Sequence, residues 1–338
     1  MKAAVLDKDG KLSVKEIKEP QIPEYGALVK IEYGSTCAGT DARLMRKLHP
    51  FPVNYPAVLG HESCGVVVKV DEKVRNFKVG DRISRVGTTP NDEYGVCWGG
   101  FAQYGIALDT KAMEEDGVPK EKWQKNRVNK VIPSDIDPKD CPMIITWRET
   151  LSYFSRLNIK EGANVLITGS GANSLAFVAH SVYNKNRVVM IGSAKRGQDA
   201  VRLGAIANID YHDNDIEKQL EKYFPDGIDA IIDGVGNSDN VNKALSLINE
   251  NGVVGVYGWN NRKGYGINPF ETTKNFRVYC AGYDEPETHD EVIKRIKEGK
   301  LKASDFYDTE NPIKLDDIAS AYERLEKREA YKFLIDLQ

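Results

Sequence analysis

The 338-residue sequence has few cysteines, and none of them stand close enough together to suggest a disulfide-rich fold. The five are odd in number and form no C-x-x-C pair: Cys37, Cys64, Cys97, Cys141 and Cys280. We therefore expect free thiols and a reducing, cytoplasmic location. The sequence also lacks an apolar run of about 18 residues, and its start is too polar for a signal peptide. A net charge of −3 gives no support to a nucleic-acid or membrane partner.

What the sequence does contain is a strand–turn–helix–strand pattern between residues 164 and 196. Residues 165–168 are a short apolar run typical of a buried parallel strand, and residues 188–191 are a second. Between them Gly169 and Gly171 form a tight turn, followed by apolar residues at helical spacing. A glycine turn that leads into a helix N-terminus suits a pyrophosphate, because free N–H groups and the helix dipole meet there. The pattern predicts a dinucleotide-binding fold, with Gly169 and Gly171 beside the cofactor and Ser174 in place of the third glycine.

The end of the second predicted strand favours NADP over NAD. NAD-binding folds place an acid at this point to bind the ribose hydroxyls. Here Gly192 is followed by Ser193, Lys195 and Arg196, with no acid before Asp199. Ser193 can donate a hydrogen bond to a 2′-phosphate, and Lys195 or Arg196 can pair with it. The alternative is that the two basic side chains are simply solvated at a helix start.

Residues 1 to about 135 contain short β-type runs separated by glycine and proline, and this predicts a β-rich domain. It holds two clusters with chemical potential, Cys37 with Thr40 and Asp41, and His61 with Glu62. A cysteine, a histidine and a carboxylate form a nitrogen, sulfur and oxygen donor set suited to zinc. A zinc ion held by three protein ligands keeps a position open for an alcohol oxygen and lowers the pKa of the hydroxyl.

Five segments together resemble the medium-chain, zinc-dependent alcohol and polyol dehydrogenase family. They occur in the family's order and spacing: TCAGTD (36–41), YPAVLGHESCGVVVKV (55–70), FKVGDRI (77–83), GGFAQY (99–104) and TGSG (168–171). The resemblance covers essentially the whole chain. It implies an α/β protein with a GroES-like β-rich catalytic domain (1–151), a Rossmann domain (152–285) and a return to the catalytic domain (286–338).

The resemblance also implies roles for individual residues. Cys37 and His61 correspond to zinc ligands, and Glu62 to the neighbouring acid that can reach the metal. Glu149, in WRETL, stands near the place of an acid that supplies a ligand in polyol dehydrogenases, although Thr150 replaces the usual proline. Thr40 corresponds to the hydroxyl that bonds the substrate oxygen and passes its proton outward.

Two features depart from the family pattern. The family usually has one residue between the cysteine and the Ser/Thr-Asp pair, but Cys37 lies three positions before Thr40. Either the loop carries an extra residue or Ala38 stands in the ligand's place. Cys64 is the alternative thiolate ligand. The lobe that carries four cysteines in some relatives is also missing, since residues 86–101 contain only Cys97. We therefore expect one catalytic zinc and no structural zinc.

The sequence thus predicts an NADP-preferring, zinc-dependent dehydrogenase that oxidises a secondary alcohol to a ketone or lactone through a zinc alkoxide and hydride transfer. The predicted substrate is a small sugar or polyol, and the family suggests a homo-dimer or homo-tetramer. Trp98, Trp147 and Trp259 are candidates for a substrate cleft, or are simply core. The alternatives are a zinc-free quinone or enoyl reductase of the same superfamily and a non-catalytic NADPH-binding protein.

Overall fold

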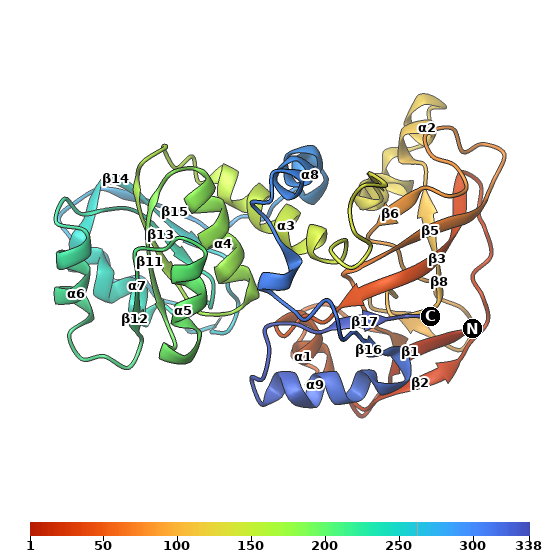
Figure 1. The fold of residues 1–338 in the computed structure, drawn as a ribbon, viewed down its shortest axis with the longest axis horizontal. Coiled ribbons are helices and arrows are strands. Elements are labelled where there is room, and N and C mark those ends of the chain that lie inside the picture. The colour runs from red at the N-terminus through yellow and green to blue at the C-terminus, as the bar shows by residue number, and fades with distance from the viewer. Residues whose placement is uncertain (262) are drawn as a thin grey trace. The chain divides into compact units, whose positions relative to one another are not determined.

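The computed structural model describes residues 1–261 and 263–338, which divide into two compact units. The first unit comprises residues 1–148 and 285–338, and the second comprises residues 149–284. The chain therefore leaves the first unit once and returns to it (Figure 1).

The first unit is β-rich and is built on two sheets. A four-stranded sheet has the order β2-β1-β4-β7, and a larger sheet has the order β16-β17-β3-β5-β6-β9, with β8 paired to β3. The strands are β1 (Lys2–Leu6), β2 (Leu12–Glu16), β3 (Gly26–Ser35), β4 (Ala57–Val58), β5 (Ser63–Val70), β6 (Arg82–Ser84), β7 (Gly95–Val96), β8 (Tyr104–Leu108), β9 (Val131–Ile132), β16 (Ile313–Lys314) and β17 (Leu334–Asp336). Because β17 comes from the C-terminal segment and pairs with β3, the end of the chain completes this sheet.

Helices cover the sheets of the first unit and connect it to the second. They are α1 (Thr40–Met45), α2 (Thr110–Glu115), α8 (His289–Lys297) and α9 (Ile318–Glu326), while α3 (Met143–Arg156) continues into the second unit. The core contains Leu6 and Ile31 from the strands, Phe101 from the loop before β8, and Ile318 and Tyr322 from α9. Residues from both ends of the sequence therefore bury apolar surface in one core.

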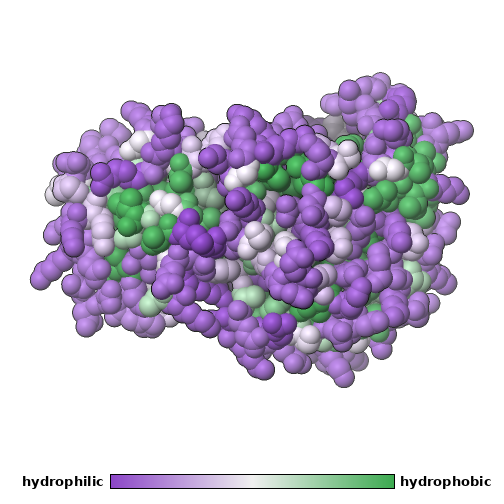
Figure 2. Space-filling model, in the orientation of Figure 1, coloured by the Kyte–Doolittle hydropathy of each residue, from purple (hydrophilic) through white to green (hydrophobic). Residues whose placement is uncertain are grey.

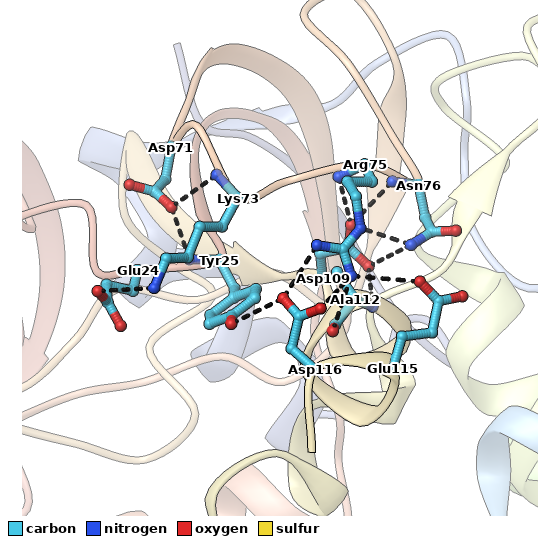
Figure 3. A network of polar contacts seen from close by, with 10 residues as sticks. All are labelled: Glu24, Tyr25, Asp71, Lys73, Arg75, Asn76, Asp109, Ala112, Glu115 and Asp116. Atoms are coloured by element: carbon cyan, nitrogen blue, oxygen red, sulfur yellow. Dashed lines mark hydrogen bonds and ion pairs between the residues drawn. The ribbon is translucent and has the colours of Figure 1, made fainter. Parts of the chain in front are cut away.

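A polar network fixes the loop after β5 to helix α2, and Figure 3 shows Arg75 reaching the end of that helix. Asp109 is buried and accepts hydrogen bonds from the backbone N–H groups of Arg75, Asn76 and Ala112 at 2.7, 2.8 and 3.0 Å. Arg75 also donates to Asp116 at the surface. Exposed ion pairs contribute little to stability, so Asp109 is the residue that holds this loop. The network is structural.

The second unit is a parallel sheet with the strand order β12-β11-β10-β13-β14-β15, which is the Rossmann order. Its strands are β10 (Asn164–Thr168), β11 (Arg187–Gly192), β12 (Ala207–Asp210), β13 (Ile228–Asp233), β14 (Ile248–Val256) and β15 (Phe276–Tyr279). Its helices are α4 (Ala172–Tyr183), α5 (Ala194–Arg202), α6 (Ile216–Tyr223) and α7 (Asp239–Ala244). Helices α4 and α5 pack on the strands that precede them (Figure 1). The strand order reverses between β10 and β13, so the turn after β10 lies at the switch point where such sheets bind ligands.

Short 3₁₀ helices join these elements: η1 (Lys120–Lys122), η2 (Gln124–Val128), η3 (Leu245–Leu247), η4 (Pro269–Glu271), η5 (Glu285–Thr288), η6 (Ala303–Asp305) and η7 (Leu315–Asp317). Among the described residues, none of the helices is both long and apolar enough to cross a bilayer. On the face of each unit that Figure 2 shows, hydrophilic residues predominate and apolar residues form small separate patches.

Candidate functional site

The structure brings Cys37, His61 and Glu62 together in the first unit. One ligand atom from each of the three lies within 4.8 Å of the others. The pairing of β3 with β5 explains this, because Gly34 near the end of β3 lies opposite Ser63 at the start of β5. Cys37 follows β3 and His61 and Glu62 precede β5, so two segments distant in sequence converge. We call these three residues the metal-ligand cluster.

Gly60 sets the backbone that presents His61. It has a φ of 102°, in the region that favours glycine, and a Cβ there would meet the backbone of Phe101. His61 and Glu62 then enter a buried position, with exposed fractions of 6% and 2%. The close approach of Phe101 and the positive φ therefore both favour glycine at this position.

Three side chains donate hydrogen bonds to Glu62, and one of them, Lys332, also forms a buried ion pair with it. Lys332 Nζ lies 2.6 and 2.5 Å from the two carboxylate oxygens, and Lys332 is only 2% exposed. Thr146 Oγ1 donates to Glu62 at 3.1 Å, and the Ser35 hydroxyl donates as well. Burial alone would lower the pKa of Lys332, but Glu62 and Cys37 raise it above its ordinary value, so the ammonium stays charged.

Asp41 orients His61 within the cluster. Its Oδ1 lies 3.4 Å from His61 Nδ1, while His61 Nε2 lies 3.6 Å from Glu62 Oε1. Asp41 Oδ2 accepts hydrogen bonds from the Cys37 N–H at 2.9 Å and from the Tyr322 hydroxyl at 2.6 Å. The carboxylate therefore fixes both the cysteine loop and the histidine ring, which is how outer carboxylates commonly support metal-ligating histidines.

The electrostatics of the cluster fit a bound cation. Burial alone would lower the pKa of His61, but Cys37 and Asp41 raise it well above its usual range. Asp41 Oδ1 and His61 Nδ1 are also buried without a hydrogen-bond partner within the described residues. A bound metal ion takes the place of a proton at such ligands and supplies positive charge to them. Together with the nitrogen, sulfur and oxygen donor set, this arrangement suits zinc.

The remaining residues predicted for the metal site lie as follows. Cys37 itself joins the cluster although Thr40 is three positions further on, and Ala38 is exposed. Thr40 begins α1 and is partly buried. Glu149 is partly buried in α3, belongs to the second unit and is not a member of the cluster. Cys64 Sγ lies 3.7 Å from the Pro138 carbonyl oxygen and also stays outside it.

The second unit carries the predicted nucleotide turn. Gly169 has a φ of 98°, and a Cβ there would meet Val235. Gly171 precedes the first residue of α4, and apart from its chain neighbours no described atom lies within 4 Å of where its Cβ would stand. Ser174, in the third glycine position, is buried and donates to the Thr168 carbonyl at 3.2 Å. The serine therefore fits because its hydroxyl finds an acceptor on the strand.

Three residues after β11 were predicted to contact the cofactor, and two of them lie beside this turn. The Ser193 N–H donates to Ser170 Oγ at 3.2 Å, and Arg196 Nη1 donates to the Ser170 carbonyl at 3.3 Å. Lys195 is exposed on the first turn of α5. The structure thus gathers Ser193 and Arg196 at the glycine turn.

Sequence reasoning missed an acid in this region. Asp210, at the end of β12, accepts from the Ala194 N–H at 2.9 Å and so caps α5 next to Ser193. The backbone N–H of His212 and its ring hold the pKa of Asp210 below its ordinary value. The residues directly after β11 include no acid before Asp199. Asp210 lies on the neighbouring strand β12, opposite Gly192, and only the strand pairing brings it to this place. Lys332 was also missed, since it lies far from the cluster in sequence.

Comparison with known proteins gives the family. Residues 23–117 match the model of the alcohol dehydrogenase GroES-like domain, and residues 176–298 match that of the zinc-binding dehydrogenases. The chain belongs to the zinc-dependent medium-chain alcohol and polyol dehydrogenase family. This confirms the predicted GroES-like and Rossmann fold classes and identifies the chain as an oxidoreductase.

Some relatives in this family span almost the whole chain, and others span just over half of it. L-galactonate-5-dehydrogenase of Escherichia coli K12 is 27% identical over 94% of each chain. The NADP-dependent isopropanol dehydrogenase of Thermoanaerobacter brockii is 30% identical over 58% of this chain and 59% of its own length. The structure of 2R,3R-butanediol dehydrogenase from Bacillus subtilis superposes with a TM-score of 0.81 at 20% identity, covering 99% of both chains. Membership of this family supports a zinc ion and a nicotinamide cofactor.

Proposed function

We propose that this dehydrogenase oxidises a secondary alcohol, a small sugar or polyol, with NADP as the preferred cofactor and a single catalytic zinc ion held by Cys37, His61 and Glu62. The observation that carries the proposal is the metal-ligand cluster, in which a thiol, an imidazole and a carboxylate converge. A zinc-free reductase needs no such set of ligands, so the cluster favours the zinc-dependent reaction. The name of the Escherichia coli relative refers to a sugar acid, which supports a sugar-like substrate. Glu149 stays a proposed further acid at the metal side.

Each residue of the cluster has a chemical task in this proposal. When bound, zinc supplies a Lewis acid for the alcohol oxygen and NADP supplies the hydride acceptor. Asp41 keeps the His61 ring in place, and Lys332 offsets the charge of Glu62. Thr40 stands at the start of α1 and receives the alcohol proton on its hydroxyl, passing it outward.

Turnover by the zinc-loaded protein tests the function. We expect reduction of NADP with secondary alcohols from a panel of sugars and polyols, and loss of this activity in Cys37→Ser. Cys280→Ser is the matched control, because Cys280 is exposed and lies in the second unit. Absence of turnover with every alcohol, or full activity of Cys37→Ser, would contradict the proposal.

The cofactor preference rests on Ser193, Lys195 and Arg196. The name of the Thermoanaerobacter brockii relative supports NADP, and Arg196 reaches the turn that would carry the pyrophosphate. Asp210 works against a 2′-phosphate, although its Oδ2 already accepts a hydrogen bond from the Ala194 N–H at 2.9 Å. The comparison of kcat/KM for NADP and NAD should show a loss of NADP preference of about tenfold in Arg196→Ala, as expected for one charge-assisted hydrogen bond. Lys185→Ala serves as the control, because Lys185 pairs with Glu161 at the surface.

We further propose a homo-dimer or homo-tetramer in the cytoplasm. β15 is the last strand in the order of the second unit's sheet, and Val278 on it is 49% exposed. An edge strand of this kind can pair with a second copy. The thiols of all five cysteines are free, as expected in a reducing compartment. Light scattering after size exclusion would measure the assembly state.

A further inference from the structure

A row of aromatic rings leads from the surface of the first unit to the metal-ligand cluster. The Trp98 ring centroid lies 5.1 Å from that of His61 and 5.9 Å from that of His49, and His49 lies 5.0 Å from Phe51. Trp98 is 42% exposed and Phe51 is 60% exposed. Trp147, by contrast, is completely buried and belongs to the core. Within the described residues of the first unit, Trp98 is therefore the tryptophan that offers an open aromatic face beside a cluster residue.

The backbone holds Trp98 in this position at a conformational cost. Its φ is 64°, in the left-handed region that a bulky side chain rarely adopts. The turn is anchored on both sides, since the Cys97 N–H donates to the Val58 carbonyl at 2.7 Å and the Gly100 N–H to the Gly60 carbonyl at 2.7 Å. Glycine or asparagine would fit this φ more easily. Strained residues that persist in this way cluster at functional sites.

We propose that Trp98 is a specificity residue that stacks on the ring of the alcohol substrate beside His61. The inference rests on the proposed function and names a substrate class for it. A flat aromatic face favours a substrate with a flat ring face, which is the C–H face in a cyclic sugar and the π face in an aryl carbinol. An open-chain alcohol such as 2-propanol has no such face. A cyclic sugar also carries hydroxyl groups that the polar His49, at the edge of the row, can bind. This agrees with the sugar preference proposed above.

Kinetics on matched substrates test this role. We compare kcat/KM for D-glucose, 1-phenylethanol and 2-propanol in the wild type, Trp98→Ala and Trp98→Phe, with zinc and NADP present. Trp98→Ala should lose about tenfold on a ring substrate and less than about twofold on 2-propanol, while Trp98→Phe keeps most of the activity. The exposed Phe270, on η4 in the second unit, gives the control Phe270→Ala. A loss of kcat/KM on D-glucose in Trp98→Ala identifies a cyclic sugar as the substrate class. A loss on 1-phenylethanol alone identifies an aryl carbinol. An equal loss on all three substrates, or none, would overturn the proposal.

Binding gives a second readout that needs no turnover. Calorimetric titration of the zinc-loaded protein with D-glucose and with 1-phenylethanol should show weaker binding of the ring ligand to Trp98→Ala than to the wild type. Trp98→Gly should unfold at a temperature no lower than Trp98→Ala, because glycine accepts the positive φ, and it should lose the same affinity. If the wild type oxidises no alcohol, the proposed function fails while this titration still decides the role of Trp98. Equal affinities of wild type and Trp98→Ala, or no binding of either ligand to the wild type, would reject that role.

Discussion

Lys332 is the residue that makes a buried carboxylate tolerable next to a cysteine and a second acid. Its ammonium contacts both oxygens of Glu62 and also donates to the Thr36 carbonyl at 3.2 Å. A buried charge without a partner costs several kcal/mol, so this side chain and a metal ion serve partly interchangeable electrostatic roles toward Glu62. The consequence is a link between the C-terminal segment and metal binding.

Removal of this charge should make the protein more dependent on zinc. In the zinc-free protein we expect Lys332→Met to lose about 3–5 kcal/mol of unfolding free energy, because Glu62 is left without its counter-ion. Zinc restores positive charge at the carboxylate, so the rise in melting temperature on adding zinc should be larger in Lys332→Met than in the wild type. Lys332→Arg keeps the charge and is the control. Equal zinc-induced shifts in all three proteins, measured by thermal unfolding, would contradict this role.

Residues of the site differ in how far the sequence could predict them. Cys37, His61 and Glu62 sit in short motifs, and their chemistry is visible in the residue types. The sequence left open whether Cys37 turns inward despite its unusual distance from Thr40, because backbone geometry decides this. Lys332 and Glu62 are 270 positions apart, and no local pattern marks Lys332. Tertiary partners of this kind cannot be read from one sequence.

At the scale of elements, helix α3 is tied to η5 and α8 through a buried arginine. Arg148 is fully buried and donates to Ser84 Oγ at 3.0 Å and to the Val128 carbonyl at 3.1 Å. It also pairs with Glu285, which Arg85 contacts at 2.7 Å. Arg148 and Glu285 are the residues at which the chain leaves and re-enters the first unit. The ion pair therefore fixes both crossings within that unit.

His289 makes this network sensitive to acid. Its Nε2 lies 3.0 Å from the Val131 carbonyl and its Nδ1 lies 3.2 Å from Arg148 Nη1, so the neutral ring donates at Nε2 and accepts at Nδ1. Burial and the neighbouring Arg148 lower the pKa of His289 to about 4. The ordinary value is 6.5, so between these values the unfolded chain binds a proton that the folded protein does not. Stability is therefore lost as the pH falls below the ordinary value.

Denaturant unfolding at several pH values checks this. Between pH 7 and pH 5 the wild type should lose about 2 kcal/mol through His289 alone. His289→Gln keeps an acceptor and a donor without titrating, so its loss over the same range should be smaller by that amount. Parallel pH profiles of the two proteins would show that His289 titrates alike in the folded and unfolded states.

The positions of the strands were easier to predict from the sequence than the contacts between the elements. The apolar runs at 165–168 and 188–191 lie within β10 and β11, because buried parallel strands need continuous apolar residues. The C-terminal strand β17, which covers Leu334–Asp336, begins two residues after Lys332. Contacts between elements, such as the capping of α5 by Asp210, depend on sheet order and were not visible.

At the scale of the whole molecule, each unit supplies a different part of the proposed chemistry. The first unit contains the metal-ligand cluster, and the second contains the glycine turn with Ser193 and Arg196. Alcohol oxidation with a nicotinamide cofactor requires both units. A metal ion held by the first would polarise the alcohol oxygen, and a cofactor held by the second would accept the hydride. The family motifs were readable because they are local, whereas the substrate ring and the cofactor preference depend on how side chains from separate elements meet.

The most direct test of the account is the metal content of purified protein, measured by plasma mass spectrometry for the wild type and Cys37→Ser. We expect about one zinc per wild-type chain, since the cluster offers three ligands and residues 86–101 carry a single cysteine where a structural site needs four. Cys37→Ser should retain far less. A wild type without zinc after growth in zinc-supplemented medium, or a Cys37→Ser variant that retains the full amount, would contradict the assignment of the cluster as the catalytic metal site.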